Sequence, residues 1–254
     1  MNHSSTSVLR TEHLTKHYGA LLVTNDVSFN IEPGQLHAII GPNGAGKTTL
    51  INLLSGELAP DEGKVWFDGV EVSGLAIHER AKKGLLRSYQ ITSIFESFTV
   101  LENATIAALG SHQNAYQFWR PMLGNAQAVR YASEAIEASG LTHCINAVAS
   151  NLGYGERRQL ELTMSLAARP KLLLLDEPMA GMSSQESAAV IALLKGLKRR
   201  YTILLIEHDM DAVFALADRI SVLVYGKILI SGTPDEIRNH PEVRAVYLGE
   251  QIES

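Results

Sequence analysis

The chain has 254 residues, of which 46% are hydrophobic and 19% charged, and its formal net charge is −5. This length allows one or two domains with a large buried core, and the negative charge argues against nucleic acid as the main partner. The single cysteine, Cys144, excludes an internal disulfide, and the lack of any run of about 20 apolar residues excludes a membrane-spanning helix.

The first ten residues are polar, so the sequence predicts no signal peptide. The N-terminal part that follows is predicted to be extended, because apolar residues alternate with polar ones and glycine-containing pairs mark the turns. The pair Asp68-Gly69 is typical of a hairpin turn. The predicted strands are residues 8–11, 21–31, 36–40, 64–67 and 70–72.

The segment after the third predicted strand reads Gly-Pro-Asn-Gly-Ala-Gly-Lys-Thr, a complete G-x-x-x-x-G-K-[ST] phosphate loop. Its glycines let backbone N–H groups approach a β-phosphate, and the helix predicted over 48–54 adds a favourable dipole. Lys47 can reach the β- and γ-phosphates, and the Thr48 hydroxyl can ligate a metal ion. The predicted nucleotide-binding residues here are Gly41, Pro42, Asn43, Gly44, Ala45, Gly46, Lys47, Thr48 and Thr49.

The middle of the chain changes to a helical pattern after Gln90. Thr99 and Glu102 form a capping box at a predicted helix start, and Gly140 is a typical stop signal. The predicted helices are residues 99–109, 126–139 and 154–168. They indicate a helical insert between two parts of a strand-rich core.

The last third of the chain returns to alternating strands and helices, and Ser183 and Glu186 form a second capping box. Strands are predicted over 171–175 and 202–206, and helices over 183–200 and 209–217. Such alternation indicates a mostly parallel sheet covered by helices on both faces. The predicted units are a nucleotide-binding core over 1–90, a helical subdomain over 91–166 and a second part of the core over 167–254.

Two acidic residues, Asp176 and Glu177, follow a buried strand. Ligands of parallel sheets bind at the carboxyl ends of the strands, so both carboxylates are expected beside the phosphate loop. Asp176 is predicted to hold magnesium through water or through Thr48, and Glu177 to act as general base on the attacking water.

Residues 152–156 read Leu-Gly-Tyr-Gly-Glu and are followed by Arg-Arg-Gln. The segment opens the third predicted helix shortly before the strand that ends in two acids. In sequence and position it resembles the signature motif, usually Leu-Ser-Gly-Gly-Gln, of the ATP-binding cassette ATPases. The resemblance covers nearly the whole chain, from about Val8 to Gly249. It implies an α/β fold: a P-loop core with a mostly parallel sheet, an N-terminal antiparallel β part and an inserted helical subdomain.

The resemblance also implies roles for single residues. Tyr18 corresponds to the aromatic residue that stacks on adenine, Gln90 to the glutamine that senses magnesium and the transport partner, and His208 to the histidine that holds the γ-phosphate. The other eight histidines show no metal-ligand spacing and are interpreted as surface or core residues. The implied catalytic residues are Lys47, Gln90, Glu177 and His208, and the implied metal ligands are Thr48, Gln90 and Asp176.

The signature segment implies further nucleotide contacts by Gly153, Gly155 and Glu156, but two positions depart from the family pattern. Gly153 stands where the family usually has serine, so a hydroxyl contact to the γ-phosphate is missing, although backbone amides at the helix start can still bind phosphate. Ser183 stands where the family usually has aspartate, and it is interpreted as a helix cap. Neither departure removes a residue that the metal or the water needs, so we expect an active enzyme.

In this family, the signature segment of one subunit closes over nucleotide held by the phosphate loop of another. The resemblance therefore implies ATP and Mg²⁺ as cofactors and a dimer, of identical or of homologous chains, with two ATP molecules at its interface. It also implies separate transmembrane permease subunits, a periplasmic solute-binding protein as an indirect partner, and a peripheral position at the cytoplasmic face of the inner membrane. Nucleic acid is not an expected partner.

The subclass is read from residues 154–158, the loop 178–183, the long helical insert and the tail 241–250. Together they look like the ATPases of branched-chain amino acid importers. Importers of urea or short amides and lipopolysaccharide exporters share much of this pattern and stay open as alternatives. Two interpretations outside transport are a soluble cassette ATPase acting on nucleic acid and a small-molecule kinase. The kinase leaves the signature segment and His208 unexplained.

Overall fold

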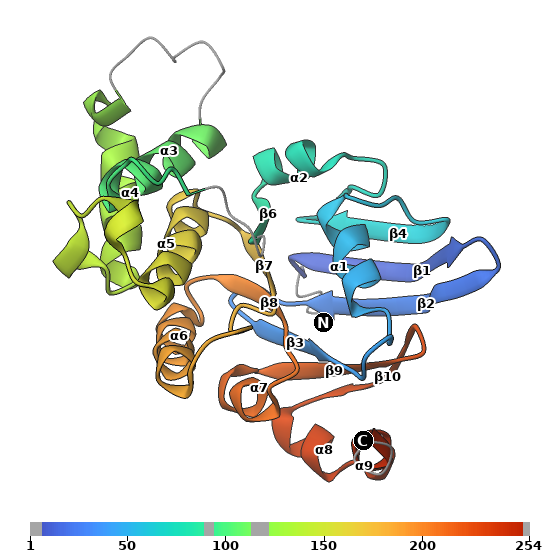
Figure 1. Ribbon diagram of the computed structural model, residues 1–254. Helices are drawn as coiled ribbons and strands as arrows, with labels where there is room; N and C mark the ends of the chain where they lie inside the picture. Colours follow the sequence, from blue (N-terminus) through green and yellow to red (C-terminus); the bar gives the residue numbers. More distant parts are fainter. Residues whose placement is uncertain (1–6, 89–93, 113–121, 251–254) are drawn as a thin grey trace, which may run out of the picture.

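The computed structural model describes residues 7–88, 94–112 and 122–250 (Figure 1). Its centre is a six-stranded sheet in which neighbouring strands are parallel, except that β9 and β10 pair antiparallel. Across the sheet the strands are β10 (Lys227–Gly232), β9 (Arg219–Val224), β3 (Leu36–Ile40), β8 (Thr202–Ile206), β7 (Leu172–Asp176) and β6 (Leu85–Ser88). The prediction of a mostly parallel sheet is confirmed.

Alternate residues of the central strands face two different layers, as the period of a strand requires. On one face, Ile39 and Leu204 pack with α1 (Lys47–Ser55) and with the second, antiparallel sheet. On the other face, Ala38 and Leu205 pack with the helices of the middle and last parts of the chain. Because both faces are covered, these strands are continuous apolar runs, which is the pattern typical of parallel sheets.

The second sheet is antiparallel and has the order β2 (Leu21–Ile31), β1 (Leu9–Tyr18), β4 (Glu62–Phe67) and β5 (Val70–Glu71). It confirms the predicted N-terminal antiparallel part and the hairpin at Asp68-Gly69. The prediction that the first strand ends at Thr11 was wrong. Strand β1 continues to Tyr18 because a register irregularity between Thr11 and Leu14, with His13 at φ 51°, breaks the alternation on which that prediction depended.

Helices cover the parallel sheet, and α3, α4 and α5 pack against one another to one side of it (Figure 1). The Thr99 capping box is present: the Glu102 N–H donates to Thr99 Oγ1 at 3.2 Å and the Thr99 N–H to Glu102 Oε2 at 2.7 Å. Besides α1, the helices are α2 (Ile77–Lys83), α3 (Val100–His112), α4 (Ala126–Ala138), α5 (Tyr154–Ala167), α6 (Ser184–Leu197), α7 (Met210–Leu216), α8 (Pro234–Asn239) and α9 (Pro241–Glu250).

The sequence did not predict α2, β6 or the β9–β10 hairpin, and it placed the end of α6 near Arg200, three residues late. Helix α6 ends early because Lys198 turns to an extended conformation, with ψ 146°, and Arg199 follows with φ 65°. Helix α2 lacks an apolar stripe; its fully buried Arg80 instead donates to the carbonyl oxygens of Leu53 and Leu54 at the end of α1. The three-part division of the chain stays a prediction.

Within the described part of the chain, no helix combines the length and the apolar character that crossing a bilayer requires.

Candidate nucleotide-binding site

Three neighbouring parallel strands, β3, β8 and β7, end at the same edge of the sheet. Ile39 of β3 and Asp176 of β7 are both in register with Ile206 of β8. The phosphate loop therefore leaves β3 beside the segment Glu207-His208, which leaves β8, and beside Asp176-Glu177 at the end of β7. This edge is where ligands of parallel sheets bind, and it brings together residues more than 160 positions apart in the sequence.

The phosphate loop lies tightly against the protein on one side and is open on the other. A Cβ atom at Gly41 would come within 2.1 Å of the Leu223 carbonyl oxygen, and one at Gly46 within 2.7 Å of the Val23 carbonyl oxygen. Gly46 also adopts φ 100°, which disfavours any side chain. At Gly44, by contrast, no atom lies within 4 Å of the Cβ position. We call this loop, which is closed at Gly41 and Gly46 and open at Gly44, the cradle. Its open side leaves room for a phosphate group to approach the backbone N–H groups.

Lys47 is buried at the first position of α1, with 9% of its surface exposed. Its ammonium donates to the carbonyl oxygens of Gly41 at 2.5 Å and Pro42 at 3.0 Å, so the cation is held inside the loop. The next residue, Thr48, is exposed on the first turn of α1, whereas Thr49 is buried. A cation, a helix N-terminus and an open glycine backbone together form an anion site.

Asp176 is ion-paired with a residue that sequence reasoning missed. Arg87 Nη2 lies 2.7 Å from Asp176 Oδ2, while Arg87 Nη1 lies 2.6 Å from Asn52 Oδ1 and 3.0 Å from Glu57 Oε2. The arginine is on β6, which neighbours β7 at the edge of the sheet. Arg87 therefore connects the Asp176 carboxylate to α1, the helix that carries the phosphate loop. Arg87 was missed because it lies on β6, a strand that the sequence did not predict.

Glu177 and His208 lie side by side, as predicted for residues acting on the same phosphate. His208 Nδ1 is 3.8 Å from Glu177 Oε1. Glu177 adopts φ 46°, a conformation that costs a non-glycine residue about 1–3 kcal/mol and therefore needs support from the surrounding structure. The His208 side chain is 64% exposed and borders a hollow of about 430 Å³. The Glu177 side chain does not line this hollow but is 38% exposed, so both groups are accessible to a ligand.

The loop that carries His208 is held by Glu207, a second residue that sequence reasoning missed. Glu207 is 1% exposed, and its carboxylate accepts the N–H groups of Met179 at 3.1 Å and His208 at 3.0 Å. These hydrogen bonds connect the segment after β8 to the segment after β7. A buried carboxylate needs such partners, and here they fix the distance between His208 and the Glu177 loop.

The signature segment lies apart from the phosphate loop of its own chain. Figure 1 shows α1 and α5 on either side of β7 and β8. Gly153 precedes α5, and its N–H donates to Glu156 Oε2 at 3.0 Å; this hydrogen bond, and second the His143 side chain, hold the pKa of the Glu156 carboxyl below its usual value. The predicted nucleotide ligands Gly153, Gly155 and Glu156 therefore do not join the site at the sheet edge within one chain.

Gly155 and Ser183 both lie next to the Glu186 side chain. A Cβ atom on Gly155 would lie 3.0 Å from Glu186 Oε1, at the far end of a side chain that can move aside. Ser183 caps α6, as the sequence predicted: its Oγ and its N–H contact Glu186 Oε2 at 2.7 and 2.9 Å, and these two hydrogen bonds hold the pKa of Glu186 below its usual value. The Ser183 hydroxyl is therefore already hydrogen-bonded to Glu186 within the helix cap.

Two predicted residues remain. Tyr18 is 48% exposed at the end of β1, paired with Leu21 of β2, and β2 runs on to Val23 against the phosphate loop. An exposed ring at this place is available for stacking. Gln90, predicted as a catalytic residue and metal ligand, lies outside the described residues.

Family models, related sequences and a solved structure all match this chain to ATP-binding cassette transporters. A family model described as "ABC transporter" matches residues 24–180, and one described as "Branched-chain amino acid ATP-binding cassette transporter" matches residues 227–253. The chain is 39% identical to the high-affinity branched-chain amino acid transport ATP-binding protein BraF of Pseudomonas aeruginosa and 37% identical to LivG of Escherichia coli K12. Each alignment covers 97% of this chain and 99% of the relative. The solved ADP conformation of MJ1267, an ATP-binding cassette of an ABC transporter, matches with a TM-score of 0.84 at 30% identity, over 96% of this chain and 99% of that one.

Proposed function

This chain belongs to the ATP-binding cassette transporter family, and from that premise we propose that it hydrolyses ATP to energise uptake of branched-chain amino acids. The observation that supports the ATPase chemistry is the sheet edge where the phosphate loop, Glu177 and His208 come together. The cargo is supported by the match of the C-terminal residues 227–253 to an importer family and by the names of the relatives. Family membership disfavours the kinase interpretation.

The triphosphate of ATP is assigned to the cradle at Gly44 and to Lys47. An anionic phosphate is a stronger partner for the ammonium than the two carbonyl oxygens that now accept from it, because hydrogen bonds between charged groups are the stronger kind. The exposed Tyr18 ring is assigned to the adenine base. In this assignment the phosphates lie at the N-terminus of α1, with the γ-phosphate toward His208.

Mg²⁺, which neutralises phosphate charge when bound, would be held by the Thr48 hydroxyl, the Asp176 carboxylate and Gln90. The donor set fits a hard cation that prefers oxygen ligands. Arg87 engages Asp176 Oδ2, which leaves the second carboxylate oxygen for the cation or its water. Arg87 thus serves as a positioning residue that aims Asp176 from the neighbouring strand.

Glu177 is assigned as the general base and His208 as the group that orients the γ-phosphate. A carboxylate that is 38% exposed can hold a water molecule and accept its proton as the water attacks phosphorus. Glu207 holds the backbone of His208, so the imidazole stays beside Glu177. These residues place reactants and neutralise charge, which are the main contributions a protein makes to phosphoryl transfer.

ATPases of this family dimerise and work with transmembrane permease subunits. The separation of α5 from α1 supports a site that is completed by a second subunit, whose residues Gly153 and Gly155 offer backbone N–H groups to the phosphates. We extend the proposal to a periplasmic solute-binding protein as indirect partner and to a position at the cytoplasmic face of the inner membrane.

Reconstitution tests the proposed transport. The chain and its transmembrane permease subunits are placed together in proteoliposomes that contain the solute-binding protein of the same importer. We expect ATP-dependent accumulation of labelled leucine, isoleucine and valine, and none when the complex carries Glu177→Gln. Uptake of urea or acetamide in place of leucine would contradict the assigned cargo but keep the ATPase role. Extraction of lipopolysaccharide would contradict import itself.

A further inference from the structure

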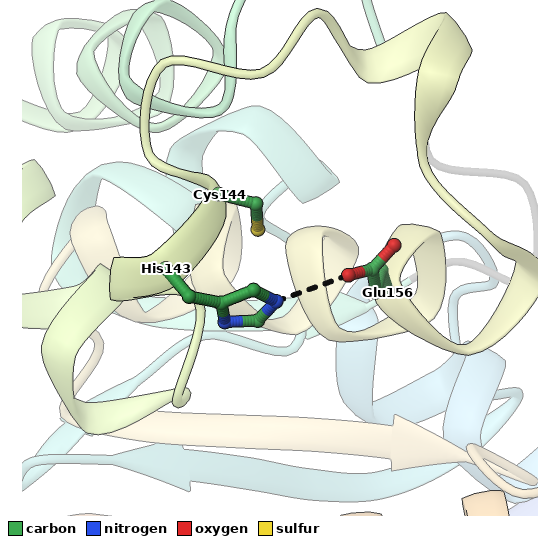
Figure 2. Close-up of side chains that lie close together, drawn as sticks. All are labelled: His143, Cys144 and Glu156. Carbon is green, nitrogen blue, oxygen red and sulfur yellow. Dashed lines mark hydrogen bonds and ion pairs between the residues drawn. The ribbon is translucent and has the colours of Figure 1, made fainter.

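Three side chains of different chemistry meet where α5 begins: His143 and Cys144, from the short 3₁₀ helix Thr142–Cys144, and Glu156, from the first turn of α5 (Figure 2). One ligand atom from each, an imidazole nitrogen, the sulfur and a carboxylate oxygen, lies within 4.8 Å of the others. From the sequence, His143 was interpreted as an ordinary surface or core histidine. The cluster lies in α-helical surroundings, away from the phosphate loop.

His143 and Glu156 face each other at a distance that a shared proton or a metal cation can bridge. His143 Nδ1 lies 3.1 Å from the Gly140 carbonyl oxygen, which can only accept. Nε2 lies 3.1 Å from Glu156 Oε1, and in the metal-free chain the ring donates a hydrogen bond to this carboxylate. A metal cation bound between the two atoms would take the place of that proton.

The surrounding hydrogen bonds orient both groups as outer partners orient metal ligands. The Gly140 carbonyl fixes the His143 ring with Nε2 pointing at the cluster. The other oxygen of Glu156, Oε2, accepts the N–H of Gly153, so Oε1 is the oxygen presented to His143. Binding a cation at Oε1 would therefore leave the cap of α5 intact.

Cys144 supplies the third donor. Its thiol is half-buried and donates to the Leu141 carbonyl oxygen at 3.4 Å. Burial, and second the Glu156 charge, raise the pKa of the thiol, so it is protonated at neutral pH without a cation. Binding forms a metal–sulfur bond, and the thiol proton is released to solvent.

We propose that His143, Cys144 and Glu156 bind a borderline divalent cation of the Zn²⁺ type, with water as the fourth ligand. In a tetrahedral zinc site, ligand atoms lie about 3.3–3.6 Å apart, close to the 3.1 Å between His143 Nε2 and Glu156 Oε1. All three ligand atoms lie within 4.8 Å of one another, so a rotation of the Cys144 side chain brings the sulfur into range. A set of nitrogen, sulfur and oxygen donors favours Zn²⁺ over Mg²⁺ or Ca²⁺, which take oxygen ligands.

The site would join the 3₁₀ helix to the first turn of α5. That turn carries Gly153 and Gly155, so a bound cation would fix the segment assigned to the second subunit's nucleotide. This consequence rests on the proposed function, whereas cation binding does not, and the two can fail independently.

Titration of the full-length chain with Co²⁺, under reducing conditions and with Mg²⁺ in excess, tests the proposal. The reductant is a phosphine, so the one cysteine of the chain is the only thiol in solution, and any thiolate-to-cobalt charge-transfer absorption must arise from Cys144. We expect this absorption to saturate at one Co²⁺ per chain and to be lost when Zn²⁺ displaces Co²⁺. No ATP is present, so the result does not depend on the ATPase.

Variants identify the other ligands. Cys144→Ser should abolish the absorption, and His143→Ala and Glu156→Gln should each weaken Co²⁺ binding by roughly 10-fold or more. His78→Ala, which removes an exposed histidine on α2, is the matched control and should bind as wild type does. Circular dichroism checks that each variant is folded. Absence of the absorption, or unchanged Co²⁺ affinity in folded His143→Ala, would overturn the site.

Discussion

Glu177→Gln is expected to lower ATP turnover by roughly 100-fold or more while ATP still binds. The amide has nearly the same shape as the carboxylate and can still contact water, but it cannot accept the proton. Steady-state phosphate release measures turnover, and equilibrium binding of labelled ATP measures affinity. Because Glu177 holds an unusual backbone conformation at φ 46°, thermal unfolding of the variant is compared with that of the wild type.

A control for this substitution is Glu242→Gln, which makes the same chemical change at an exposed position on α9. It should hydrolyse ATP at the wild-type rate. Wild-type turnover in Glu177→Gln itself would remove Glu177 from the role of general base. Loss of ATP binding together with turnover would instead show that its carboxylate serves the fold of the site.

Lys47→Ala is expected to weaken ATP binding itself, by roughly 10- to 100-fold in Kd. A hydrogen bond to a charged group contributes about 1.5–3 kcal/mol, and each 1.4 kcal/mol changes Kd tenfold. The substitution removes the buried ammonium that donates to Gly41 and Pro42, and with it the cation assigned to the phosphates. Calorimetric titration with a non-hydrolysable ATP analogue measures the change.

Lys195→Ala, at an exposed position on α6, removes an equal charge from another helix and serves as the control. Its affinity for the analogue should match that of the wild type. If Lys47→Ala remained folded and bound the analogue as tightly as the wild type does, the phosphate loop could not have the role assigned to it.

The parts of the fold that the sequence predicted are those with a local physical cause. Strands buried on both faces must be apolar throughout, so β3 and β8 were predicted with their observed bounds. The capping boxes at Thr99 and Ser183 use residues only three positions apart, and both are present. The expected place of Glu177 beside the phosphate loop followed from one rule, that parallel strands present their carboxyl ends at the same edge, whereas His208 was identified by the family resemblance.

The parts that the sequence did not predict depend on contacts between distant residues. Arg87 reaches Asp176 across 89 positions, and Glu207 receives the Met179 N–H across 28. The cradle at Gly46 is backed by Val23 of another sheet. The cluster of His143, Cys144 and Glu156 was not predicted because 13 positions and a change from 3₁₀ helix to α-helix separate Glu156 from His143. None of these pairs has a spacing that periodicity or a motif could indicate.

The most direct test of the central claim is a crystal structure of the Glu177→Gln variant with ATP and Mg²⁺. The account predicts triphosphate density in the open cradle at Gly44, contacted by Lys47 and His208, with Gly153 and Gly155 of a second subunit closing over it. ATP bound elsewhere on the chain, or His208 out of reach of the γ-phosphate, would contradict the claim that three strand ends form one nucleotide site.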